Sequence, residues 1–577
     1  MKKLNPSFKS LFLRFYQKIK PNRKKYLFVT VLLMIGASFV EFVSIGLVLP
    51  FLAVLINPDQ IMSYDFVKHI FHYLELSNKA DLQFLITVSF CVAIIISGFT
   101  RIMMSGMQAK ISRDIGSDFY VEIYTRTIDQ PYITHLSRHS SDIQAGLKKV
   151  DNIVSNFMFP MMSIVTSFLI IFSILALLSI INWILTIVLF VGFGSIYLLI
   201  LNKTKKYLRF NSEIISNNNN KFFKNVQEVL GAIRDIKLGT NEYFYIKKFK
   251  EIVISLQKAL AQNYLIGHIP RYLVESLAII LLAVIAYFFS KSENGLSNVI
   301  PILGTFALGA QRILPLCQEG YYSIASIRGE YSSLVDVLFL LEQSKRENID
   351  HSLSSSMKFS ETITGKNLSF KYHDEQDWII KNLNFFIKKG SIVGIVGPSG
   401  VGKSTLLDLM LGLLDPNRGS IYIDKKKLNT EIDKRSWARK IANVPQDIFI
   451  ADATIEENIA FSIEKEKINH TLLKRVCKHV QVDVFAKKLV NKYKTKLGEN
   501  GASISGGQKQ RIGIARALYK QPELLILDEA TNALDSVTAK RVLKNLKMFY
   551  KDLTIIIVSH ERDKLKKFSD GLIDLTK

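Results

Sequence analysis

The sequence has little cysteine, tryptophan or proline, with 3, 3 and 13 of each among 577 residues. Cys91, Cys317 and Cys477 are widely separated, which excludes a disulfide framework and a metal site built on cysteine spacing. Acidic residues are fewer than basic ones: the chain has 50 aspartates and glutamates and 75 lysines and arginines, which give a formal net charge of +25. Charge of either sign is missing from several long runs before residue 316. Length and apolar runs together exclude a single soluble domain.

Six of these apolar runs approach or exceed the roughly 20 residues that a membrane-spanning helix needs. They cover residues 26–56, 82–104, 157–180, 183–201, 273–289 and 299–316. Short polar turns separate the third run from the fourth and the fifth from the sixth, whereas the polar stretches 110–156 and 202–271 are long. The pattern predicts an all-α domain of six transmembrane helices, whose helices extend into two long loops on one side.

The distribution of charge predicts the orientation in the membrane. Residues 1–25 include many lysines and arginines and no acidic residue, whereas the loop after the first span carries four acidic and two basic residues. The positive-inside rule therefore predicts a cytoplasmic N-terminus, and six spans return the chain to the cytoplasm. A membrane accounts for the net charge, so nucleic acid is not expected as a partner. A cleavable signal peptide is not expected either.

A glycine-rich segment in the last third has the pattern of a phosphate-binding loop. It consists of Gly397, Pro398, Ser399, Gly400, Val401, Gly402, Lys403, Ser404 and Thr405. Glycines let backbone N–H groups crowd around phosphates, Lys403 can reach the β- and γ-phosphate oxygens, and the Ser404 hydroxyl can bind Mg²⁺. The segment predicts a nucleotide site.

Two acidic residues follow a buried apolar strand further along the chain. The run 524–527 is typical of a parallel strand, and Asp528 and Glu529 come at its end. Asp528 can hold the metal ion, and Glu529 can act as the general base that orients a water. A second phosphate-binding device is predicted where Ser505, Gly506, Gly507 and Gln508 open a helix expected at 510–519.

These motifs, together with Gln446, Asp535 and His560, resemble the ordered motif set of an ATP-binding-cassette (ABC) ATPase. The resemblance implies that Gln446 reaches Mg²⁺ and borders the transmembrane loops, and that His560 hydrogen-bonds the γ-phosphate. It also implies nucleotide contacts for Asp535 and for Tyr372, which matches the adenine-stacking aromatic. The alternative for Tyr372 is an ordinary surface tyrosine at a strand end.

The whole chain resembles an ABC exporter of type I/type IV, a multidomain membrane protein with an α/β P-loop NTPase cassette. The resemblance implies a transmembrane domain at 1–343, a linker at 344–358 and a cassette at 359–577. The segment 495–501 resembles a loop characteristic of exporters, and 129–135 and 240–244 resemble coupling helices. One cassette and six spans imply a homodimer with two composite ATP sites, although a heterodimer with a second half-transporter stays open.

Ionisable residues in or near the spans indicate where a substrate binds. A charge at mid-bilayer costs about 3 kcal/mol, so such residues tend to face a cavity. The candidates are Glu41, Arg101, Arg271 and Arg312, and arginine suits a pyrophosphate because it binds in a bidentate manner. The alternative for Arg101 and Arg271 is that they lie near cytoplasmic ends of spans and snorkel.

The patterns around Glu41, Arg271 and Arg312 are similar to those of bacterial lipid-linked oligosaccharide flippases. This resemblance implies ATP-driven flipping of a polyprenyl-pyrophosphate-linked saccharide across the inner (cytoplasmic) membrane of a bacterium. The absence of a peptidase domain before the first span counts against a peptidase-containing bacteriocin exporter. Export of another lipid or of a peptide, and an ATP-gated channel or sensor, remain alternatives. The stretch 61–76 is expected to form a short amphipathic helix on the outer face.

Overall fold

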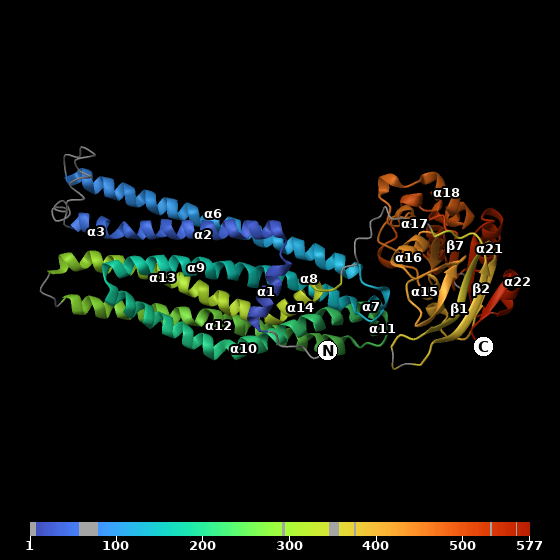
Figure 1. Cartoon of the computed structure of the whole chain (residues 1–577), viewed down its shortest axis with the longest axis horizontal. Coiled ribbons are helices and arrows are strands. Elements are labelled where there is room, and N and C mark those ends of the chain that lie inside the picture. The colour runs from blue at the N-terminus through green and yellow to red at the C-terminus, as the bar shows by residue number, and fades with distance from the viewer. Residues whose placement is uncertain are drawn as a thin grey trace. The chain divides into compact units, whose positions relative to one another are not determined.

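The computed structural model describes residues 7–56, 79–290, 295–344, 357–373, 375, 377–530, 534–560 and 562–576. The expected outer helix at 61–76 and most of the expected linker, 345–356, lie outside these ranges. The chain divides into two compact units (Figure 1). Unit 1 comprises Met1–Gln130 and Ser137–Arg346, and unit 2 comprises Pro131–Leu136 and Glu347–Lys577.

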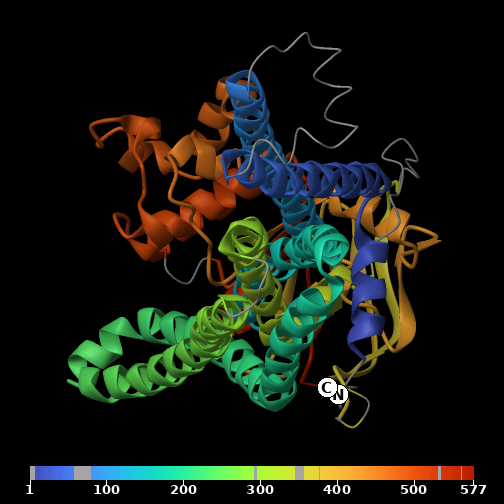
Figure 2. The same ribbon diagram turned by 90° about the vertical axis from the view of Figure 1, so that its left-hand side faces the viewer.

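In its described residues, unit 1 consists of helices. They are α1 (Phe8–Lys18), α2 (Pro21–Gly46), α3 (Val48–Ile56), α6 (Lys79–Ile128), α8 (Ser140–Ile153), the π-helical turn η1 (Val154–Met158), α9 (Phe159–Ile181), α10 (Trp183–Gly231), α11 (Ile233–Leu238), α12 (Glu242–Ser290), α13 (Gly295–Gly329) and α14 (Tyr331–Leu341). Helix α2 packs against α6 and α9, whereas α13 packs against α9 and α12, and α10 packs against α12 (Figure 2).

The apolar runs lie on these helices. Among the described residues, four stretches are long and apolar enough to cross a membrane: Pro21–Ile56, Ala80–Ile128, Ser140–Ile181 and Trp183–Gly231. The fifth and sixth expected spans lie within α12 and α13, where several side chains fall outside the described part. The third and fourth runs form a tight hairpin because Asn182 is extended and its side chain caps α10 by accepting from Leu185 N (3.1 Å).

The two long polar stretches are helical extensions of the spans. Helix α10 continues through the asparagine run 217–220, which has poor helix propensity. Packing compensates for this, because Asn218 is buried and donates to Ser255 Oγ (3.0 Å), while Asn220 Oδ1 accepts from the buried Lys149 (2.9 Å). Lys149 also pairs with Asp336 (2.7 Å) and thereby joins α8, α10 and α14.

Unit 2 contains two β-sheets (Figure 1). Its strands are β1 (Thr362–Phe370), β2 (Ile380–Lys388), β3 (Ile392–Val396), β4 (Arg418–Ile423), β5 (Lys426–Lys427), β6 (Ile441–Val444), β7 (Leu524–Asp528), β8 (Thr554–Val558) and β9 (Gly571–Asp574). Strands in the order β6-β7-β8-β3-β9 form a parallel sheet, and strands in the order β2-β1-β4-β5 form an antiparallel one.

Helices pack around the parallel sheet, and its inner strands β3 and β8 are buried along their whole length. The helices are α15 (Lys403–Met410), α16 (Glu431–Ala438), α17 (Ile455–Ile459), α18 (His470–His479), α19 (Val482–Ala486), α20 (Gly506–Tyr519), α21 (Ser536–Phe549) and α22 (Arg562–Phe568), with the short turns η2 (Lys465–Lys467), η3 (Lys492–Lys494) and η4 (Glu499–Gly501). Val558 of β8 pairs with Asp528 of β7 on one side and with Ile395 of β3 on the other. The carboxyl ends of β3, β7 and β8 therefore meet at one edge.

A short helix from the long loop after α6 belongs to unit 2. Helix α7 (Tyr132–Leu136) overlaps the segment 129–135 that was expected to be a coupling helix. Tyr132 packs against the hydrophobic core of unit 2, and burial, with the nearby Asp408 charge, raises the pKa of its hydroxyl. At the second expected coupling segment, α11 ends at Leu238 and α12 begins at Glu242, both in unit 1.

Candidate nucleotide site and membrane cavity

The glycine-rich loop joins β3 to α15 at the carboxyl edge of the parallel sheet. Gly400 and Gly402 adopt φ values of +81° and +101°, in the left-handed region that favours glycine. A Cβ at Gly402 would also lie 2.8 Å from Ile379 Cγ2. Glycine is therefore required at Gly402 for two reasons. The loop ends at the N-terminus of α15, where backbone N–H groups have no partner within the helix and can bind an anion.

Lys403 spans this loop with its buried side chain. Its Nζ donates to the carbonyl oxygens of Gly397 (2.8 Å) and Pro398 (3.1 Å) and lies 3.3 Å from His560 Nδ1. The lysine charge is thus held at the mouth of the loop, where the phosphates of a nucleotide can accept its hydrogen bonds. Ser404, the expected metal ligand, is exposed at the next position.

Glu529 and His560 come together from neighbouring strands. Glu529 follows β7, and its N–H donates to Val558 O of β8 (3.2 Å). Its φ of +51° is uncommon for a residue with a side chain, and such strain occurs at functional sites. The Glu529 carboxylate contacts His560 Nε2 directly. The residue expected to be the general base and the histidine expected to contact the γ-phosphate therefore lie beside each other.

Two half-buried carboxyl groups have raised pKa values at this edge of the sheet. Burial and the Glu529 charge raise the pKa of Asp528, while the charges of Lys403 and His560 oppose the shift. Burial and the charge of Asp528 raise the pKa of Asp408 to about 6. Carboxylates that are costly to ionise without a cation fit a site that takes Mg²⁺. Asp408 was not expected from the sequence, where its only signal is a carboxylate inside the apolar run of α15.

Tyr372 lies next to the start of α15. Its hydroxyl is 3.2 Å from Thr405 Oγ1, and its ring packs edge-to-face on Phe370 with 5.0 Å between centroids. The side chain is half-buried against the core of unit 2. The structure thus brings Tyr372 together with the phosphate loop. Gln446 is exposed two residues beyond the end of β6.

The Ser505 segment and Asp535 form helix caps. Ser505 and Gln508 make a reciprocal capping box, so α20 begins at Gly506, four residues earlier than the sequence predicts. Asp535 caps α21 by accepting from Thr538 N (2.9 Å), and this interaction lowers the pKa of its carboxyl. Ser505, Gly506 and Asp535 are exposed, so all three are open to a ligand.

A cavity of about 660 Å³ in unit 1 contains three of the four substrate candidates. The Glu41 side chain is buried, with Arg101 Nε 3.7 Å from its Oε2 and Arg312 Nε 3.6 Å from its Oε1. The three residues come from α2, α6 and α13. Glu41 also accepts a hydrogen bond from Ser97, one turn before Arg101 on α6, which the sequence did not reveal.

Arg271 is placed differently from the other candidates. It pairs with Glu275, one turn further along α12, at 2.7 Å, and both side chains are exposed. It is not among the residues that line the cavity of Glu41. Arg271 and Glu275 are four residues apart, and on a helix this spacing favours an ion pair, so the sequence contained a signal for the pair.

Both units of the chain match family models of known proteins. Residues 43–303 match the family model for the ABC transporter transmembrane region, and residues 380–532 match the model for the ABC transporter ATP-binding domain. The heterocyst differentiation ATP-binding protein HepA of Nostoc sp. is 25% identical over 564 residues, which cover 96% of this chain and 89% of that protein. An ATP-dependent lipid A-core flippase of Pasteurella multocida is 25% identical over 503 residues, which cover 86% and 85% respectively.

A solved structure of a bacterial Atm1-family ABC exporter with ATP bound shares the fold. Its TM-score is 0.74 at 19% identity, and the match covers 96% of this chain and 93% of that one. The two family models account for the helical unit and the cassette in the order that the sequence predicts. The chain is therefore an ABC exporter half-transporter, a multi-pass membrane protein whose ATP-binding cassette drives transport of a substrate by ATP hydrolysis.

Proposed function

We propose that this exporter flips a lipid with an anionic head group, specifically a polyprenyl-pyrophosphate-linked saccharide, across the bacterial cytoplasmic membrane. The observation that carries the proposal is the position of Glu41 between Arg101 and Arg312 in the wall of the cavity. Charged groups are costly in a membrane-spanning unit, so a cluster that lines a cavity is expected to serve a ligand.

The geometry of the cluster leaves the two arginines able to bind an anionic ligand. Their Nε atoms are 3.6 and 3.7 Å from Glu41, longer than a charge-assisted hydrogen bond, and both side chains are more than a third exposed. One carboxylate balances only one of the two guanidinium charges. The cluster itself therefore carries one excess positive charge, while Glu319 supplies a second carboxylate elsewhere in the cavity lining. The two guanidinium groups present planar donors, which suit the oxygens of a pyrophosphate.

The relatives support a lipid rather than a peptide. Several matching proteins are named ATP-dependent lipid A-core flippases, from Pasteurella and Cupriavidus species, each about 25% identical to this chain. The polar residues Ser44, Gln108 and Thr166 also line the cavity, and Gln108 donates to Thr166 Oγ1 (2.9 Å). Hydroxyl and amide groups of this kind can hydrogen-bond a saccharide.

At the cassette, each residue has a distinct role in ATP hydrolysis. Lys403 and the loop N–H groups hold the phosphates, and Tyr372 stacks on the adenine. Ser404, Gln446 and Asp528 would hold Mg²⁺, which would supply positive charge for phosphoryl transfer. Glu529 takes the proton of the attacking water, and His560 orients the γ-phosphate. The direct Glu529–His560 contact supports this division of roles.

The working unit is a homodimer with two composite sites. One chain supplies a single cassette and a single helical unit, and closed twofold symmetry is the commonest way to complete such an assembly. The exposed Ser505, Gly506 and Asp535 are available to complete the site of the partner. In each composite site, ATP held by one phosphate loop meets the Ser505 segment of the partner subunit.

Reconstitution in lipid vesicles tests the substrate. The purified protein should move a fluorescent polyprenyl-pyrophosphate-linked oligosaccharide between leaflets only with ATP and Mg²⁺. Arg312→Ala should slow this movement, and Arg271→Ala is the matched control because Arg271 lies outside the cavity. If wild-type protein moves a peptide or an unglycosylated phospholipid but no lipid-linked saccharide, the proposed substrate is wrong and only the exporter assignment remains.

A further inference from the structure

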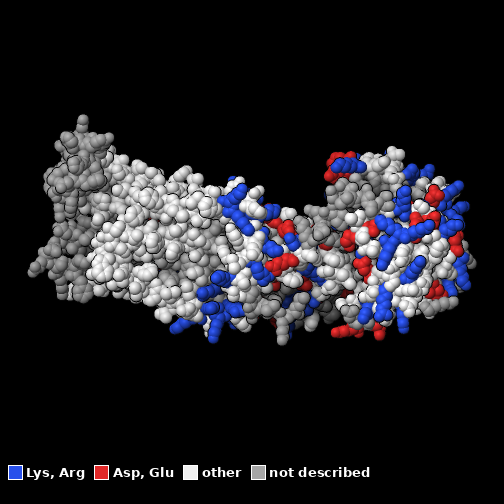
Figure 3. Space-filling view, in the orientation of Figure 1, with Lys and Arg blue, Asp and Glu red and all other residues white. Residues whose placement is uncertain are grey.

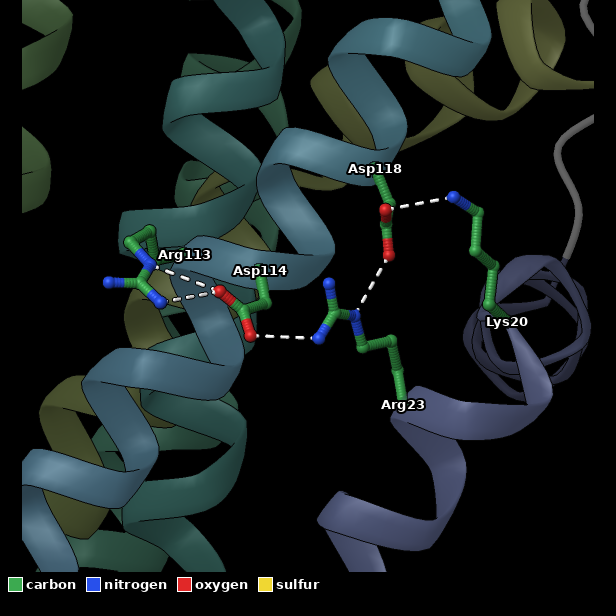
Figure 4. Close-up of polar contacts among 5 residues, drawn as sticks. All are labelled: Lys20, Arg23, Arg113, Asp114 and Asp118. Atoms are coloured by element: carbon green, nitrogen blue, oxygen red, sulfur yellow. Dashed lines mark hydrogen bonds and ion pairs between the residues drawn. The ribbon is translucent and has the colours of Figure 1, made fainter.

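A network of ion pairs fixes the start of α2 against α6 (Figure 4). Arg23 Nη1 lies 2.8 Å from Asp114 Oδ2, and Arg23 Nε lies 3.0 Å from Asp118 Oδ2. Lys20 Nζ lies 2.9 Å from the other oxygen of Asp118, and Arg113 pairs with Asp114 at 2.7 Å. The two aspartates are one turn apart on α6, so they hold Lys20, the N-cap residue of α2, and Arg23, in its first turn, in place.

A hollow of about 1000 Å³ adjoins this network. Its lining comes from the start of α2 and from α6: Lys20, Pro21, Asn22, Arg23, Lys25, Tyr26, Val29 and Asp118. The lining contains three cations and one carboxylate, that of Asp118, while Asp114 outside the lining also pairs with Arg23. Lys25 is exposed, and no ion pair or hydrogen bond of its side chain is found within the residues that the structure describes. The hollow therefore has an excess of positive charge that the protein itself does not neutralise.

The surface of α2 changes from cationic to apolar in the direction of the membrane. Lys25 and Val29 are spaced i to i+4, while Tyr26, Val29 and Leu32 are spaced i to i+3, so all four share one face of the helix. Tyr26, Val29 and Leu32 are all exposed. A tyrosine between a lysine and aliphatic side chains is typical of the membrane interface, where an amphipathic ring lies at head-group level.

We propose that this hollow, defined by Lys20, Arg23, Lys25 and Tyr26, binds an anionic phospholipid of the cytoplasmic leaflet that is not the transported substrate. The phosphate lies against Lys20 and Lys25, and an acyl chain follows Tyr26, Val29 and Leu32. None of these residues lines the cavity of Glu41, so the two sites are separate.

Three observations favour a lipid over a soluble anion. The cations lead directly into the apolar, exposed face of a helix long enough to cross the membrane. On the face drawn in Figure 3, a broad uncharged surface of unit 1 gives way to a charged zone in which lysine and arginine lie together with some aspartate and glutamate. Finally, α6 continues from Asp118 to Ile128 and leads into α7 of the cassette unit, so this end of α6 is on the side of ATP. Anionic lipids are concentrated in that leaflet.

Native mass spectrometry of the full-length protein tests the proposal. The protein in detergent is titrated with phosphatidylglycerol or with phosphatidylcholine, and retained lipids are counted. Wild type should retain phosphatidylglycerol more tightly than phosphatidylcholine. Lys25→Ala should weaken phosphatidylglycerol binding about fivefold, the factor that corresponds to about 1 kcal/mol per lysine at an anionic surface. Lys25→Arg should restore it, and phosphatidylcholine binding should not change.

Two further variants separate this site from general surface charge. Lys205→Ala removes an exposed lysine of α10, just after the predicted fourth span, and should leave phosphatidylglycerol binding unchanged. Asp118→Asn removes the carboxylate that competes for Lys20 and Arg23 and should tighten binding. Equal losses for Lys25→Ala and Lys205→Ala, no preference for phosphatidylglycerol, or displacement by millimolar inorganic phosphate would each overturn the proposal.

Discussion

His560 Nε2 contacts Glu529 Oε1, although the two residues follow different strands of the parallel sheet. The pairing of Asp528 with Val558 sets this contact, because it aligns the ends of β7 and β8. His560 Nδ1 lies 3.3 Å from Lys403 Nζ on its other side. The imidazole thereby links the proposed general base to the lysine of the phosphate loop.

Glu529→Gln should reduce ATP hydrolysis at least about 100-fold while leaving ATP binding intact, because an amide cannot take the proton of water. The measurement is steady-state phosphate release by purified protein, with nucleotide retention measured in parallel. Glu523→Gln is the matched control, because Glu523 lies at the other end of β7, where it pairs with Lys389 (3.2 Å) and Lys440 (2.5 Å). Near-normal hydrolysis by Glu529→Gln would show that the general base lies elsewhere.

Lys403→Ala and Ser505→Arg should each abolish ATP hydrolysis as homodimers, since each damages both composite sites. Co-assembly of the two variants should restore about a quarter of wild-type activity, because half of the dimers then contain one intact site. The melting temperature of each variant checks that Ser505→Arg, which removes a helix cap, still folds. Absence of restored hydrolysis in verified mixed dimers would rule out sites shared between chains.

Arg312→Ala should lower the number of lipids moved per ATP hydrolysed by about tenfold or more, the loss expected for a charged hydrogen bond. Glu41→Ala should lower the same ratio, because the arginines lose the carboxylate that positions them. The ratio is measured in vesicles that contain equal amounts of each folded variant. A purely structural ion pair predicts instead a lower yield and melting temperature with an unchanged ratio in the protein that does fold.

Asp408→Asn should stabilise the nucleotide-free protein more at pH 7 than at pH 5. The pKa of Asp408 is raised to about 6 by burial and by the charge of Asp528, so wild type loses stability as pH rises from the unfolded value of 3.8 through 6. Asparagine does not ionise and avoids this loss. With allowance for solvent screening, we expect the gain in melting temperature to grow by about 2–4 °C between pH 5 and pH 7. A gain that is equal at both pH values would contradict the raised pKa.

Local sequence was sufficient to predict the motifs of the cassette. Gly400 and Gly402 can be predicted from the sequence because their left-handed backbone conformation favours glycine. Asp528 and Glu529 can be predicted because they come at the end of an apolar run. Each depends on residues within one turn or one strand. The start of α20 was missed by four residues because Ser505 and Gln508 cap the helix together, which helix periodicity does not reveal.

The sequence by itself determined the order of the apolar runs and the exporter architecture, and it predicted the residues of the nucleotide site, because these follow from hydropathy, glycine and short spacing. Only the tertiary structure decided which distant charges meet. Glu41, Arg101 and Arg312 lie on three helices whose packing places them around one cavity, while Arg271 instead pairs along its own helix. Such contacts depend on helix rotation and strand register, which are set by packing over the whole unit rather than by neighbouring residues.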